Sequence, residues 1–355
     1  MKIKLSLVAI HLSMMACYSQ EVQIQEIEVK DTSLLQESLA NSKSVIKLED
    51  EIQAISINDA LDKEFFVEFK KTSEYASEPY IRGRGNKGVP VFLEGMRLNA
   101  GHDDSTNLFG LSDVAQIDVY RGANGAQLGM GAMSGAIVVK FKEPEFNNSE
   151  EFKVSGFANS KYEFLSKDGS TNSLGANLYN NFINFSLSGG VSDYNNYEDG
   201  NSNEVLHSQY DTSNFNSSVA IKTSKDSYVY ARYMRDRANT QDPTSRTLNT
   251  TNNIWTYTDR PNDEAKNYFV GFRKESLAGF NDIDLQYFKN EIHYDIKTKR
   301  EALIQEQQEL FRESKTDGAK LSANKDFENH HLSFATTHSD MYISNGLRNY
   351  NYGTN

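Results

Sequence analysis

The sequence of 355 residues contains one cysteine, one tryptophan and five prolines. Because that cysteine, Cys17, lies near the N-terminus, the rest of the chain has no thiol for a disulfide or a thiolate metal site. The mean hydropathy is −0.63, and no stretch after the N-terminus approaches the roughly 18 consecutive apolar residues of a membrane-spanning helix. A net charge of −12 argues against a nucleic-acid partner, since phosphates repel an acidic protein.

The N-terminus has the pattern of a secretory signal peptide. Two lysines precede the apolar run Leu5–Met15, and small residues lie around Ala16–Ser19. We therefore predict that residues 1–20 are a signal peptide. A lipoprotein site at Cys17 is an alternative, but the residues before it match that motif poorly.

Two segments that contain glycine and arginine stand out in the first half of the chain. Tyr80–Gly85 reads YIRGRG, and Ala115–Ile137 reads AQIDVYRGANGAQLGMGAMSGAI. A nucleotide-binding loop is one interpretation of the second segment. However, Gly129-x-Gly131-x-x-x-Gly135 misses the GxGxxG spacing by one residue, and a β-like run follows where a helix should begin. The glycines instead allow positive φ angles and close packing of the backbone.

After Pro144 the sequence changes to polar and aromatic segments of period two. Ile183, Phe185 and Leu187 alternate with polar residues, as do the apolar residues of 215–222. In the segment 267–273, Tyr268, Val270 and Phe272 alternate with Asn267, Phe269, Gly271 and Arg273. This pattern, with one face apolar and the other polar, is typical of transmembrane β-strands of about 10 residues.

The predicted connections between these strands alternate in length. Tight links are expected near residues 180–181, 223–226, 276–281 and 327–329, and long polar links at 193–212, 238–264 and 297–316. Such sorting is typical of outer-membrane barrels, which have short periplasmic turns and longer extracellular loops. A soluble antiparallel sheet, the alternative, has no reason to sort its loops by length.

Together these motifs resemble the TonB-dependent outer-membrane receptors, in which a small plug domain sits inside a β-barrel. The resemblance implies an α+β plug domain followed by antiparallel transmembrane β-barrel strands, and it implies export to the bacterial outer membrane. It also implies energy-coupled uptake of a scarce nutrient, such as a ferric siderophore or a similar metal chelate, rather than enzyme activity. No cofactor is implied, and the partners would be TonB, the outer-membrane lipid and the chelate. The expected domains are the signal peptide (1–20), the TonB box and linker (21–44), the plug (45–146) and a partial β-barrel (147–355).

The segment between signal peptide and plug resembles the TonB box of this family. Residues 21–30 read EVQIQEIEVK, and the best-matching core is Glu26, Ile27, Glu28, Val29 and Lys30. In the family the periplasmic protein TonB captures this peptide as an added strand, through main-chain hydrogen bonds. An ordinary first strand is the alternative.

Several plug motifs match the family with substitutions. A helix is expected at Ser56–Leu61 and a strand at Val89–Leu93, followed by a turn at Glu94-Gly95 where the family has Asp-Gly. We expect the longer Glu94 side chain to lack the local hydrogen bonds of that aspartate. In the second motif, Asp118 replaces glutamate and Ala123 replaces proline. The motif residues are Gly83, Arg84, Gly85, Glu94, Gly95, Gly122, Gly129 and Gly135.

The resemblance also assigns roles to charged residues of the plug. Arg82 and Arg121 correspond to arginines that pair with glutamates on the inner wall of the barrel and lock the plug in place; surface arginines in loops are the alternative. The plug residues expected to face the ligand are Arg97, His102, Asp103 and Asp104, with an exposed polar loop as the alternative.

The number of strands predicts an incomplete barrel. We count roughly nine strands, the last near His330–Met341, whereas such receptors close with about 22 strands. The sequence is therefore expected to be the N-terminal portion of a receptor, as a fragment or a truncated gene product. A non-transporting ligand-binding or signalling remnant is thus the alternative function. His330 and His331 do not suggest a metal pair, because adjacent residues of a strand point to opposite faces.

Overall fold

The computed structural model describes residues 43–48, 57–62, 64–71, 77–85, 89–98, 109–122, 125, 128, 132, 134–164, 167–243, 256–300, 306–327 and 330–349. The chain divides into two units, residues 1–41 and 42–355, and all described residues belong to the second. The predicted signal peptide and TonB box therefore lie outside the described residues.

The plug region contains two small sheets. Five strands form the first in the order β1-β7-β8-β5-β6, with bounds Lys43–Lys47, Val114–Arg121, Gly135–Phe141, Val91–Leu93 and Met96–Arg97. The second is β2-β3-β4, with bounds Val67–Lys71, Ser77–Ile81 and Arg84–Gly85. Helix α3 (Ile57–Leu61) confirms the predicted helix, and the 3-10 helix η3 (Leu111–Asp113) precedes β7. Apolar residues of both sheets and of α3 form one core.

Two tight turns of the plug have the same backbone geometry. Arg82-Gly83 joins β3 to β4, and Glu94-Gly95 joins β5 to β6. The φ angles are 52° and 73° in the first turn and 51° and 90° in the second. Two-residue hairpins favour positive φ at both positions because that twist matches the strands, and glycine adopts it without a steric penalty. The glycine-arginine motif thus builds a hairpin turn.

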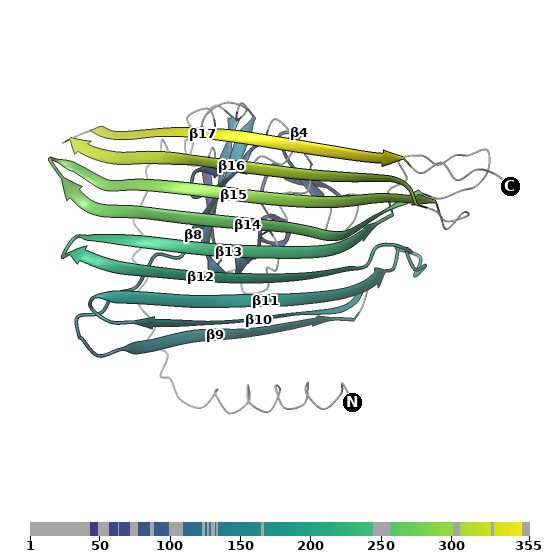
Figure 1. Cartoon of the computed structure of the whole chain (residues 1–355), viewed down its shortest axis with the longest axis horizontal. Helices are drawn as coiled ribbons and strands as arrows, with labels where there is room; N and C mark the ends of the chain where they lie inside the picture. The colour runs from purple at the N-terminus through teal and green to yellow at the C-terminus, as the bar shows by residue number, and fades with distance from the viewer. Residues whose placement is uncertain are drawn as a thin grey trace. The chain divides into compact units, whose positions relative to one another are not determined.

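The second half of the chain is one antiparallel sheet of nine strands in sequence order, β9 to β17 (Figure 1). Their bounds are Lys153–Glu163, Lys167–Tyr179, Ile183–Tyr197, Tyr210–Ser224, Ser227–Asp242, Thr256–Leu277, Phe280–Arg300, Glu306–Phe327 and His330–Asn349. The four predicted tight links are confirmed between β10 and β11, β12 and β13, β14 and β15, and β16 and β17. The predicted long links were too long, because the strands continue well into them; β15 and β16, for example, end and begin at Arg300 and Glu306.

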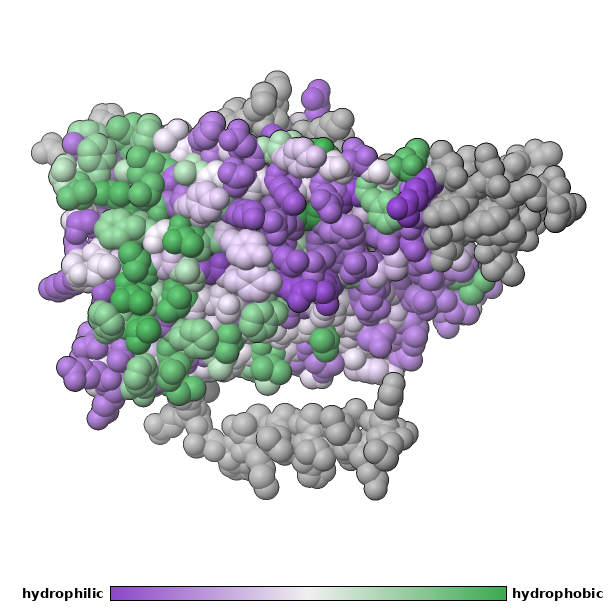
Figure 2. All heavy atoms as spheres, viewed as in Figure 1, coloured by the Kyte–Doolittle hydropathy of each residue, from purple (hydrophilic) through white to green (hydrophobic). Residues whose placement is uncertain are grey.

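Side chains of the large sheet alternate as the sequence predicted. On β11, Asn184 and Ser188 are buried whereas Phe185 and Leu187 are exposed. The apolar residues of the exposed face gather toward the ends joined by the short links, and hydrophilic residues cover the other ends (Figure 2). We call the face of the sheet that carries the buried side chains the inward face, and the face that carries the exposed side chains the outward face.

The plug packs against the inward face of the sheet. Met234, Phe269 and Phe288 of the sheet belong to the same buried cluster as the plug core. The rings of Phe141 on β8 and Phe269 on β14 meet edge to face, with centroids 5.6 Å apart. No helix among the described residues is long and apolar enough to cross a membrane.

Candidate functional site

The interface between plug and sheet carries the candidate functional site, and Arg121 was expected to contribute to it. Its guanidinium instead lies within the plug, with Nη2 2.5 Å from Oε1 of Glu64. Arg121 also donates hydrogen bonds to the carbonyl of Phe65 at 2.9 Å and to the hydroxyl of Ser44 at 2.8 Å. The partners described for Arg121 therefore all lie within the plug, and its pairing with a wall glutamate stays a prediction. The resemblance to the family suggested a partner on the barrel wall, and a sequence motif alone does not show that Glu64 lies next to Arg121 in the fold.

Arg82 also differs from the expected lock. Its side chain is exposed in the turn between β3 and β4, and its guanidinium lies beside Gly122. No ion pair joins Arg82 to the large sheet among the described residues. The position of Arg82 is set by the turn, and the structure does not bring it together with the residues that hold the plug against the sheet.

Asp118, which replaces the family's glutamate, organises the N-terminal edge of the plug. Its fully buried carboxylate lies 3.0 Å from the ammonium groups of both Lys43 on β1 and Lys140 on β8. Gln116 donates a hydrogen bond to the other oxygen at 2.9 Å. Partial burial alone would lower the pKa of Lys43, but the hydrogen bond and the charge of Asp118 outweigh it and raise that pKa. Asp118 thus ties the first strand of the plug to its centre.

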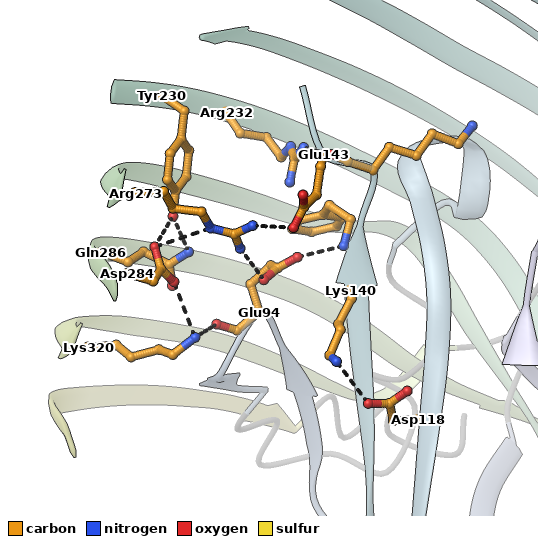
Figure 3. Close-up of polar contacts among 12 residues, drawn as sticks. Glu94, Asp118, Lys140, Glu143, Tyr230, Arg232, Arg273, Asp284, Gln286 and Lys320 are labelled. Atoms are coloured by element: carbon orange, nitrogen blue, oxygen red, sulfur yellow. Dashed lines mark hydrogen bonds and ion pairs between the residues drawn. The ribbon is translucent and has the colours of Figure 1, made fainter. Parts of the chain in front are cut away.

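Glu94 forms the first ionic contact between plug and sheet (Figure 3). Its Oε1 accepts a hydrogen bond from the backbone N–H of Phe141 at 2.6 Å, and Oε2 lies 3.6 Å from Nη2 of Arg273 on β14. The longer side chain therefore has a hydrogen-bonding partner on β8 and an ion-pair partner on the sheet, and neither lies within the turn. Arg273 also contacts Glu143, in the segment after β8, at 2.6 Å.

The sheet supplies its own carboxylate at this contact. Asp284 on β15 lies 3.5 Å from Arg273 and 3.5 Å from Lys320, whose ammonium also donates to the carbonyl of Glu94 at 3.2 Å. The hydroxyl of Tyr230 donates to Asp284 at 3.2 Å. Arg273 and Lys320 therefore each have a partner on the plug and a partner on the wall.

A second ionic contact joins η3 to β13. Nε of Arg232 lies 3.0 Å from the carboxylate of Asp113, and its Nη2 donates to the carbonyl of Lys142 at 2.8 Å. The guanidinium also stacks over the ring of Phe141, 4.3 Å from its centre. Burial raises the pKa of Asp113 even though Arg232 and Lys142 oppose the shift.

Further polar contacts surround these ion pairs. The backbone N–H of Gly110 donates to Asp236 at 2.7 Å, and Asn216 donates to the hydroxyl of Ser112 at 2.8 Å. A cavity of about 220 Å³ lies beside them, lined by both plug and sheet. The described interface therefore combines a small apolar centre with separate polar contacts.

In both ionic contacts the plug supplies the carboxylate and the sheet supplies the cation, the reverse of the predicted arrangement. Sequence reasoning missed this, although two signals were present. Glu94 departs from the family's aspartate, and Arg273 falls on the polar side of a period-two strand. Of the remaining predicted residues, Arg97 is half-buried on β6, and the TonB box, His102, Asp103, Asp104 and Gly129 lie outside the described residues.

Among the described residues, no group of three or more histidine, cysteine, aspartate or glutamate residues is arranged to hold a metal ion.

Comparison with known proteins identifies the family of the first region. Residues 24–136 match the family model of the TonB-dependent receptor plug domain. No curated protein sequence matches the chain. Among solved structures, the copper transporter OprC superposes with a TM-score of 0.70 and 15% identity, over 82% of this chain and 43% of its own.

Two further structures have the same fold. The ferripyoverdine receptor of the Pseudomonas aeruginosa outer membrane gives a TM-score of 0.64 at 14% identity, over 87% of this chain and 44% of its own. The Serratia marcescens hemophore receptor HasR, in complex with its hemophore and heme, gives 0.62 at 17% identity, over 85% and 46%. The chain thus spans less than half the length of these three proteins.

Proposed function

We propose that this chain, a member of the TonB-dependent receptor family, forms the plug and the first wall strands of an outer-membrane receptor for energy-coupled uptake. The observation that carries this proposal is the way the plug is held: separate ion pairs at Arg273 and Arg232 surround a small apolar centre. Polar interfaces of this kind allow two packed regions to move relative to each other. A plug that must shift to admit a nutrient needs such an interface.

Energy would enter the plug through its first strand. In this proposal, TonB adds Glu26–Lys30 as a strand to its own sheet and pulls on the linker that leads into β1. β1 is the edge strand of the plug sheet and pairs only with β7 among the described strands. Its first two residues are anchored, Lys43 by Asp118 and Ser44 by Arg121. A pull on the linker would therefore act first on these anchors.

The proposed cargo is a metal chelate, most simply a ferric siderophore. The structural relatives support this class, since their names refer to copper, ferripyoverdine and heme. Arg97, His102, Asp103 and Asp104 are proposed to face the cargo from the plug. We expect His102→Ala to weaken chelate binding in a receptor whose barrel remains intact; unchanged binding would leave this segment as an exposed polar loop.

Transport can be tested on whole cells. Ile27→Pro removes a backbone donor that β-addition to TonB requires, whereas Ser38→Pro makes the same change in the linker. We expect cells with Ile27→Pro to lose uptake of radiolabelled iron supplied as a panel of ferric siderophores, and cells with Ser38→Pro to retain it. Equal uptake by the two variants would contradict the proposed coupling.

A non-transporting remnant of such a receptor is the alternative. The chain spans 43% to 46% of the length of the three relatives described above, and the size of the natural product therefore tests this alternative directly. The apparent mass of the protein in outer-membrane fractions distinguishes a complete receptor from a remnant. A band well above 40.1 kDa that shifts on boiling indicates a complete barrel, and a product no larger than 40.1 kDa favours the remnant.

A further inference from the structure

Aromatic rings and glycines face each other across the strands of the large sheet. Four pairs lie directly opposite in the strand register: Phe157 and Gly175, Tyr194 and Gly169, Tyr230 and Gly271, and Phe288 and Gly318. In each pair, a Cβ atom placed on the glycine would lie only 2.4 to 2.7 Å from the ring. Side chains do not approach a Cβ atom that closely, so each ring occupies space that any residue other than glycine would need.

This pairing determines how the rings lie on the wall. Side chains of a strand ordinarily stand roughly perpendicular to their sheet. A glycine directly opposite leaves space over the neighbouring strand, and the aromatic ring leans into that space. The ring then turns a face toward whatever packs on the wall. Accordingly, Nζ of Lys142 lies over the Phe157 ring, 4.9 Å from its centre, and the guanidinium of Arg273 lies 5.9 Å from the centre of the Tyr230 ring.

Three of the four rings meet the plug region. Phe288 belongs to the same buried cluster as the plug core, and Tyr230 packs against that cluster. Phe157 lies under Lys142, the first residue after β8. We define the ring seat as Phe157, Tyr230 and Phe288. The plug therefore contacts rings on three strand pairs of the wall, β9–β10, β13–β14 and β15–β16.

Tyr230 connects the ring seat to the ion pairs that hold the plug turn (Figure 3). Its hydroxyl donates to Asp284 at 3.2 Å and accepts a hydrogen bond from Gln286 at 3.0 Å. Asp284 in turn lies beside Arg273, the cation that faces Glu94. A displaced Tyr230 ring would therefore move the groups that position Arg273 as well as its own apolar surface.

We propose that Gly175, Gly271 and Gly318 are positioning residues for the plug, because they allow the ring seat to lie against the wall. Flat ring faces bury apolar area without interlocking with the plug. The plug can then leave and return without a change in the side-chain conformations of the wall. The link to uptake rests on the proposed function, whereas the hold on the plug does not.

The variant Gly271→Ala in the full, membrane-inserted receptor tests the proposal. The three atoms nearest to a Cβ at this position all belong to Tyr230, so alanine displaces that side chain toward the plug. Overpacking of this kind is unfavourable, and we expect protease cleavage within the plug region to become about 10-fold faster. Gly346→Ala is the matched control, since it also lies opposite an aromatic residue, Phe311, but its Cβ would be 4.0 Å from that ring.

Two further variants identify the ring as the cause. Tyr230→Ala removes the ring, so that adding Gly271→Ala to it should change the cleavage rate no further. Gly175→Ala repeats the test on another strand pair, because the three atoms nearest to its Cβ all belong to Phe157. We expect this variant to accelerate cleavage as well. Heat-modifiability of the barrel should be unchanged throughout, which separates a loosened plug from a damaged wall.

Four outcomes would overturn the proposal. A wild-type cleavage rate in Gly271→Ala or in Gly175→Ala would exclude that glycine as a positioning residue. Further acceleration by Gly271→Ala in the absence of the Tyr230 ring would show that the glycine acts in another way. Equal acceleration in Gly346→Ala would indicate a general effect of an added methyl group. Loss of heat-modifiability in Gly271→Ala and Gly175→Ala would assign both glycines to the fold of the wall.

Iron uptake measured in parallel separates this proposal from the proposed function. Cleavage reports how firmly the plug is held, whether or not the receptor transports a chelate. Faster cleavage in a receptor that takes up no iron would support the ring seat and contradict the transport proposal.

Discussion

Arg121 and Arg273 are two largely buried arginines with several polar partners, and they illustrate two kinds of ionic contact. All the partners described for Arg121 belong to the plug, namely Glu64, Phe65 and Ser44. Arg273 instead contacts carboxylates of the turn, of the segment after β8 and of the wall. The first arrangement holds the plug together, and the second joins it to its surroundings. The comparison distinguishes interactions that stabilise the fold of the plug from interactions that attach the plug to the large sheet.

The largest effect is expected when Arg121 loses its partner. Glu64→Ala leaves a guanidinium with 3% of its side chain exposed without a carboxylate, which we expect to destabilise the plug by about 3 kcal/mol. Hydrogen exchange of β1 and β7 should increase while that of the large sheet changes little. Glu68→Ala, an exposed glutamate on β2, is the matched control. Equal protection of β1 and β7 from hydrogen exchange in Glu64→Ala and Glu68→Ala would contradict a stabilising role of Glu64.

Removal of Arg273 should act on attachment rather than on the plug itself. Arg273→Ala leaves Lys320 as the cation beside Asp284 and removes the cation that lies beside the Glu94 carboxylate, and we expect attachment to weaken by about 2 kcal/mol. Protease cleavage within the plug region of the membrane-inserted receptor should become faster. Arg237→Ala, on the outward face, provides the control. If cleavage is equally slow in both, Arg273 does not hold the plug.

A smaller effect is expected from Glu94→Gln. The amide oxygen can still accept the hydrogen bond from Phe141, but the charge that attracts Arg273 is lost. We expect attachment to weaken by about 1 kcal/mol, with hydrogen exchange of β5 and β8 unchanged. The same cleavage assay should place this variant between wild type and Arg273→Ala. An effect as large as that of Arg273→Ala would mean that Glu94 is the main partner of Arg273.

The smallest effect concerns pH. The pKa of Asp113 is raised above its ordinary value of 3.8 because the carboxyl is buried. The folded state therefore holds this proton at pH values where the unfolded state has released it, so stability from this group falls as pH rises from 3.8 through the raised value. Asp113→Asn removes the titration and should flatten the pH dependence of thermal unfolding above pH 3.8. An identical pH profile in both proteins would exclude Asp113 as its source.

The sequence predicted those features that depend on local patterns. Period two located the strands of the large sheet and put Asn184 inside and Phe185 outside. The two-residue turn at Glu94-Gly95 was also predicted, because its backbone conformation is determined locally.

Features that depend on distant partners were not predicted. Arg121 pairs with Glu64, 57 residues away, and Glu94 meets Arg273 only when β14 lies beside the plug. Similarity to a family indicates that the arginines of this motif form ion pairs, but it does not identify the carboxylate that each arginine contacts in this chain. Strand lengths were underestimated for a related reason: hydrogen bonding to neighbouring strands extends β14 to β17 into polar sequence.

The position of Asp284 on the wall has a consequence for repeated use. If the plug turn departs, as the proposed function requires, Arg273 would keep Asp284 as a counter-ion, and Tyr230 would continue to orient that carboxylate. The vacated surface therefore retains its charge balance and its side-chain geometry. A returning turn meets a prepared docking position instead of a guanidinium that has reoriented toward water, so the contact can open and close many times without a slow rearrangement of the wall.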